Sequence, residues 1–135
     1  MCDFEPGLRK SLQKSFPQIP LKGCHFHYSQ CIWRYVQCHG MKKTFTENSQ
    51  FRSLIHGTIG LAFNPLERLT EAVNVLEIMG NEIKEKSSQK YVKSFFAYLK
   101  STWINGIYPP GSWNYFLVHG STSNNHNEGY NHKIR

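Results

Sequence analysis

Two carboxylates lie near opposite ends of this 135-residue sequence, Asp3 in Cys-Asp-Phe-Glu-Pro-Gly and Glu128 in Asn-His-Asn-Glu-Gly-Tyr. Carboxylate oxygens are the hard ligands that Mg²⁺ and Mn²⁺ prefer. Carboxylates that converge on such ions can orient a water or a 3′-hydroxyl and stabilise charge on a phosphodiester. Taken singly, each residue also fits a surface position, since Glu128 would be favoured in the first turn of a helix. The metal hypothesis therefore requires a fold that brings the two residues together.

Thiol and imidazole side chains are concentrated between Cys24 and His39. Zinc is one interpretation, with Cys24, His27 and Cys31 as ligands, because His27 and Cys31 would be one helical turn apart. Against zinc, the spacing is not that of a standard paired zinc module, and Cys31 lies on an apolar stripe as a core thiol does. Structural packing is the favoured interpretation, with zinc and a role near a catalytic site as alternatives.

These motifs together resemble the downstream part of the catalytic domain of Mutator-like element (MULE) transposases. Cys24 and His27 match the Cys-x-x-His element of that family, within Gly-Cys-His-Phe-His-Tyr-Ser-Gln. Asn124 and Asn125 match the paired Asn that precedes the family's Glu. One departure is Ser-Thr-Ser before this pair, where the family usually has a basic residue and Thr. The helical middle of the chain matches only by pattern.

The resemblance implies DNA strand cleavage and transfer by an Asp, Asp and Glu triad that holds Mg²⁺ or Mn²⁺, in the nucleus. Asp3 would be the second Asp and Glu128 the Glu. The first Asp has no counterpart, because the sequence begins two residues before Asp3. We therefore expect a transposase fragment or remnant, truncated or domesticated, that is inactive by itself.

The resemblance also implies an α/β fragment that is mostly helical, a partial ribonuclease H-like fold with an all-α insertion. Residues 1–41 would be the ribonuclease H-like part, 42–112 the helical insertion, and 113–135 the terminal segment with the Glu motif.

The net charge of +7 and the pI near 9.3 favour an anionic partner such as DNA. A row of lysines on one side of a predicted helix can neutralise phosphates without reading bases, although a solvated helix face explains it equally well. These lysines are Lys86, Lys90, Lys93 and Lys100. The alternative function is thus a non-catalytic basic helical module that binds DNA or a protein partner.

No apolar run approaches the roughly 20 residues that cross a bilayer, and no secretory signal is visible at the N-terminus. We expect an intracellular protein without a membrane partner. Neither a Gly-x-Ser-x-Gly elbow nor a Gly-rich phosphate loop is present. A serine hydrolase or a nucleotide hydrolase has no support from the sequence.

The elements that must position these residues follow from apolar spacing. Pro6 and the apolar positions after it predict a helix over 6–15, and the segment 19–26 is consistent with a short buried strand. From His27 onward, side chains recur at helical spacing and predict a helix that ends at Gly40.

Further helices are predicted in the middle of the chain. One includes Phe51 to Ile59, and the next starts with Asn64 as N-cap and runs towards Gly80. A fourth carries Val92 to Trp103, and a helix could start near Asn125. The three tryptophans are expected to be core anchors.

Overall fold

A computed structural model describes residues 4–120 of the chain. Its α-helices are α1 (Pro6–Ser15), α2 (His25–Cys38), α3 (Lys42–Glu47), α4 (Ser49–Gly60), α5 (Leu69–Asn81) and α6 (Lys86–Tyr98). Short 3₁₀ turns join them, namely η1 (Leu61–Phe63), η2 (Leu66–Arg68) and η4 (Pro110–Ser112), and the π-helical η3 (Leu99–Ile104) continues α6. The expectation of a mostly helical chain is confirmed, and no β-sheet occurs within residues 4–120.

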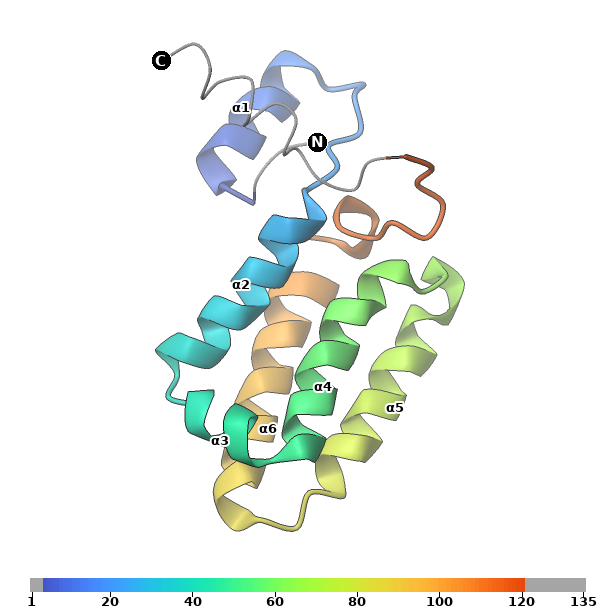
Figure 1. Cartoon of the computed structure of the whole chain (residues 1–135). Helices are drawn as coiled ribbons and strands as arrows, with labels where there is room; N and C mark the ends of the chain where they lie inside the picture. The colour runs from blue at the N-terminus through green and yellow to red at the C-terminus, as the bar shows by residue number, and fades with distance from the viewer. Residues whose placement is uncertain (1–3, 121–135) are drawn as a thin grey trace.

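Four of the helices, α2, α4, α5 and α6, run alongside one another as a bundle, with α3 at one end and α1 at the other (Figure 1). α4 contacts α2, α3 and α5, and α6 packs against α5. Apolar side chains repeat every three or four residues on these helices, so each one turns an apolar face inward. The resulting core is continuous and includes Ile32 of α2, Leu54 of α4, Val73 of α5 and Phe95 of α6.

The predicted helix over 6–15 is confirmed as α1, and the helix that ends at Gly40 is confirmed as α2. Gly40 has a positive φ of 71°, a conformation that Gly adopts without steric cost just after a helix. α3 was not predicted individually.

The predicted strand over 19–26 is wrong. α2 already begins at His25, and Ile19 is 53% exposed rather than buried. Within residues 4–120, Gly23 alone has a bridge assignment, and its N–H donates to the carbonyl of Ser112 at 2.7 Å. A short apolar run becomes a strand only when a neighbouring strand accepts and donates its hydrogen bonds, and residues 4–120 supply none.

The helix over the Phe51 stripe is confirmed as α4, and Asn48 caps it by accepting a hydrogen bond from the N–H of Phe51 at 2.9 Å. The cap predicted at Asn64 is wrong, because η2 intervenes and α5 begins only at Leu69. The carbonyl of Asn64 instead accepts a hydrogen bond from the Asn114 side chain at 2.7 Å.

The helix predicted to carry Val92 to Trp103 is confirmed as α6 with η3. The helix predicted near Asn125 lies outside the described residues.

Candidate functional site

Three segments that carry or adjoin the family-like motifs meet at one end of the bundle. We call this region the motif end and define it as Phe4, Gly23–His25 and Ser112–Tyr115. The hydroxyl of Tyr108 donates to the carbonyl of Phe4, and the hydroxyl of Tyr115 donates to the carbonyl of Gly23. Phe4 directly follows Asp3, and Tyr115 precedes Glu128 by 13 residues. Phe4, the Cys-x-x-His element and the segment before the Glu motif are therefore held together.

An aromatic cluster lies beneath the motif end. The rings of Tyr28 and Trp113 stack at 4.9 Å with an interplanar angle of 4°, and Trp103 packs edge-on against Tyr28 at 4.9 Å. The Trp113 indole N–H donates to the carbonyls of Trp103 and Tyr108 at 2.9 and 3.0 Å. The rings pack against one another and the indole N–H of Trp113 has hydrogen-bond partners, so this cluster holds the segments above it in place. Trp103 and Trp113 are thus core anchors, as predicted, whereas Trp33 is half-buried.

Gly23 allows the first two segments to approach closely. A Cβ atom placed on Gly23 would lie 2.0 Å from Cζ of Phe4, so any larger residue would displace the Phe4 ring. Lys22, the preceding residue, donates from Nζ to the carbonyl of Gly111 at 2.7 Å, and its partial burial lowers its pKa. Gly23 therefore packs against the Phe4 ring, while Lys22 bonds to the start of the 111–115 segment.

Cys24 and His27 lie at the start of α2. Cys24 is the fully buried N-cap residue, His27 is half-buried, and Cys31 follows one turn later, half-buried on the same helix. Within residues 4–120, no group of three His, Cys, Asp or Glu side chains is arranged to hold a metal ion. The buried position of Cys24 fits the packing interpretation of the Cys-x-x-His element.

His25 is a residue that sequence reasoning missed. Its ring lies 4.7 Å from Phe63 and 5.6 Å from Tyr115, so it bridges α2, η1 and the 112–115 segment. Burial lowers the pKa of His25, an effect that the backbone of Ile59 partly opposes. The sequence did carry a signal, since His25 lies one helical turn before Tyr28 on the buried side of α2.

The predicted carboxylates Asp3 and Glu128, and the motif residues Asn124 and Asn125, lie outside the described residues. Among the described residues, Phe4 follows Asp3 directly and packs against Gly23, which bonds to Ser112 in the segment that leads towards Glu128.

The predicted lysines lie on the outer side of α6 and η3, and all four are exposed. Lys100 differs from the others, because its Nζ lies 2.7 Å from Oε1 of Glu77 on α5. Lys86, Lys90 and Lys93 have no ion pair within residues 4–120. We call these three the lysine stripe, since their spacing of four and three residues places them on one face of α6.

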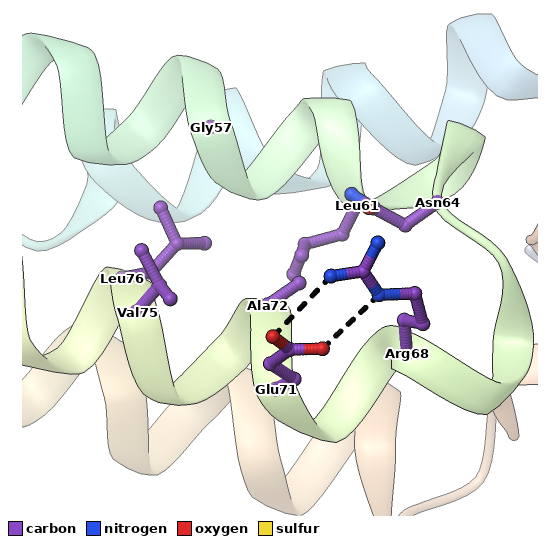
Figure 2. Close-up of a pocket in the computed structure, with 8 residues that line it drawn as sticks. All are labelled: Gly57, Leu61, Asn64, Arg68, Glu71, Ala72, Val75 and Leu76. Carbon is purple, nitrogen blue, oxygen red and sulfur yellow. Dashed lines mark hydrogen bonds and ion pairs between the residues drawn. The ribbon is translucent and has the colours of Figure 1, made fainter.

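A hollow of about 380 Å³ lies between α4 and the start of α5 (Figure 2). Arg68 and Glu71 face each other across its rim with a two-point contact, in which Nε and Nη2 donate to the carboxylate at 3.1 and 3.3 Å. Both side chains are well exposed, so solvent screens the pair. No residue of the motif end or the lysine stripe lines the hollow. Arg68, the basic residue in its lining, is already paired with Glu71.

Among residues 4–120, no helix is long and apolar enough to cross a membrane. Comparisons with protein-family models, with curated proteins and with solved structures found no match to this chain.

Proposed function

We propose that this chain is the downstream part of a Mutator-like transposase catalytic domain, a nuclear protein fragment that acts on DNA in its parent form. Asp3 and Glu128 are two of the three carboxylates that hold Mg²⁺ or Mn²⁺ in that form. When bound, the ions would activate a water or a 3′-hydroxyl for attack on a phosphodiester. The proposal assigns two of the three carboxylates to residues of this chain, and we expect the 135-residue chain not to cut DNA by itself.

The observation that carries the proposal is the convergence at the motif end. A carboxylate site assembled from distant parts of a sequence needs a scaffold that joins those parts. The hydrogen bonds to Phe4 and Gly23, and the contact of Gly23 with Ser112, join the residue after Asp3, the Cys-x-x-His element and a segment that precedes Glu128 by 13 to 16 residues. Contacts of this kind would be required for the proposed site, and they support the proposal.

Exposed apolar side chains near the motif end support the proposal further. Large apolar residues there are about half exposed or more, which marks an interaction surface when they are grouped. They are Phe63, Phe116 and Leu117. The sheet of a ribonuclease H-like fold is a partner of suitable chemistry, because its face is also apolar.

The test is a double-mutant cycle on Mn²⁺ binding, measured by electron paramagnetic resonance of free Mn²⁺. If Asp3 and Glu128 share one ion, Asp3→Asn and Glu128→Gln each weaken binding about tenfold, and the double variant is barely weaker than either. Glu82→Gln, at an exposed Glu, is the matched control. Strictly additive losses, or binding that neither substitution changes, would contradict a shared site.

A nicking assay addresses activity separately. We expect the 135-residue chain to leave labelled supercoiled DNA intact with Mg²⁺ or Mn²⁺. Nicking that disappears in Glu128→Ala would show that the chain is catalytically competent and would refute the inactivity part of the proposal.

The lysine stripe favours a second candidate function, binding of DNA phosphates without catalysis. Lys86, Lys90 and Lys93 are exposed, share one face and lack carboxylate partners within residues 4–120. Three phosphate contacts should give a slope of about −2.7 in a plot of log affinity against log salt concentration for duplex DNA.

Fluorescence anisotropy with labelled duplex DNA tests this candidate. Replacing all three lysines with Gln should remove most of the salt dependence. The matched control is Lys100→Gln, because Lys100 already pairs with Glu77 and should contribute little. Equal effects of Lys100→Gln and of a single stripe substitution would argue against the stripe as the DNA contact.

A further inference from the structure

A groove of about 450 Å³ runs between α2 and α4, with α3 at one end. Its walls are almost entirely apolar: Phe26 and Trp33 come from α2, Phe45 from α3, and Ile55 and Ile59 from α4. Trp33 packs edge-on against Phe45 with ring centroids 4.8 Å apart. The aromatic walls therefore support each other while one side remains open to solvent. No residue of the groove belongs to the lysine stripe.

The dimensions of the groove suit a short helix. Phe26, Gln30 and Trp33 follow one another at intervals of four and three residues along α2, which spans about 10 Å. An amphipathic helix that lies in a groove places apolar anchors at the same intervals on its own surface. Two turns of a partner helix would match this length.

The charge around the groove defines the partner more closely. Neither α2 nor α4 contains Asp or Glu, and the whole sequence between Glu5 and Glu47 carries only basic charges. Arg34 is exposed immediately after Trp33 on α2. At the other wall, Arg52 donates from Nη1 to the carbonyl of Thr46 at 2.9 Å, so its positive charge is held where α3 ends. Glu47, the last residue of α3, is the one carboxylate in the three helices that line the groove. A partner with acidic residues beside its apolar anchors complements this surface.

We infer that the α2–α4 groove is a docking site for an acidic amphipathic helix of a partner protein. This inference does not depend on the proposed transposase origin, because it uses no residue of the carboxylate pair. Apolar anchors supply the burial, and the carboxylates beside them face Arg34 and Arg52.

Trp33 provides a direct reporter. The sequence has three tryptophans, and the other two are buried, with exposures of 1% for Trp103 and 0% for Trp113. When acrylamide quenches the tryptophan fluorescence of the free full-length chain, the loss of signal should therefore come mainly from Trp33. A synthetic helical peptide with Leu at positions i, i+4 and i+7 and Glu at its flanks should protect Trp33 from quenching.

Two control peptides separate the two features of the partner. Replacing the flanking Glu with Lys keeps the apolar anchors, and should weaken binding about tenfold through like-charge repulsion. Moving the Leu residues off their helical face keeps the composition and should abolish protection.

Two variants locate the site on the chain. Arg34→Glu reverses an exposed charge one residue after Trp33 on α2, and should weaken binding of the acidic peptide about tenfold, with the fold retained. Lys14→Glu makes the same charge change on α1, outside the groove lining, and should have little effect. Ile59→Glu, inside the groove, should abolish protection, and its circular dichroism spectrum reports whether it stays folded.

The inference is overturned if Trp33 already resists acrylamide in the free chain, since the groove would then be covered by this chain or a second copy. Equal binding of the acidic and basic peptides would also overturn it, as would equal effects of Arg34→Glu and Lys14→Glu. Single-stranded DNA that protects Trp33 better than the acidic peptide would assign the groove to bases instead.

Discussion

His25 links three elements at the motif end through its contacts with Phe63 and Tyr115. Its half-buried position disfavours the charged imidazolium, which is why its pKa is lowered. The unfolded chain keeps the ordinary pKa near 6.5 and so binds a proton more readily than the folded chain. Acidification below this value therefore favours unfolding.

We expect the free energy of unfolding to fall as the pH decreases from 7 to 5, and to fall less in His25→Phe. Urea denaturation at a series of pH values measures both slopes. His119→Phe, at an exposed histidine, is the matched control. If His25→Phe and wild type show the same slope over this range, the buried imidazole is not the cause.

At Gly80, α5 packs closely against both α4 and α6. A Cβ atom on Gly80 would lie 2.8 Å from Cγ1 of Val92 and 2.9 Å from Cδ1 of Leu54. Both neighbours are buried, so they have little room to move. The absence of a side chain at this position sets how tightly the three helices pack.

Alanine at Gly80 tests this packing against alanine at Gly60. Gly60 has helical backbone angles at the end of α4, and a Cβ there meets nothing within 4 Å. Gly60→Ala should therefore raise the free energy of unfolding by about 0.4 to 1 kcal/mol. Gly80→Ala adds the same helix preference but overpacks the core, which costs about 1 to 3 kcal/mol. Comparable stabilisation of both variants in thermal unfolding would show that the interface has spare room.

At the scale of the whole molecule, one core joins the described parts of the segments 1–41, 42–112 and 113–135 that the resemblance suggested. Tyr28 and Ile32 from the first segment are fully buried, and Trp113 from the last stacks on Tyr28. Removing either outer segment would expose the partners of these side chains. The helical middle is therefore not self-sufficient in its packing.

We expect a chain of residues 42–112 to lose the cooperative thermal transition of residues 1–135. It would keep local helix propensity but lack the aromatic cluster that closes the bundle. Circular dichroism during heating is the measurement, with a 4–120 chain as the control that should unfold cooperatively. A sharp transition in the 42–112 chain would establish the middle as an independent domain.

The sequence by itself determined where α1, α2, α4 and α6 lie. Their apolar residues recur at helical spacing, and that period is a local property of the chain. It also determined the positive charge and the motifs that suggest a transposase. The cap expected at Asn64 was wrong because a 3₁₀ turn follows it. The hydrogen bonds of a 3₁₀ turn span three residues and those of an α-helix four, so the two begin with very similar sequences.

Only the tertiary structure decided which distant segments meet. Residues 19–26 are not a strand, since strand formation depends on a pairing partner that a local pattern does not reveal. The link between Phe4 and Tyr108 spans 104 residues, and the ion pair that separates Lys100 from the lysine stripe joins two helices. Such contacts depend on how helix faces pack against one another, and spacing along one helix does not specify its neighbour.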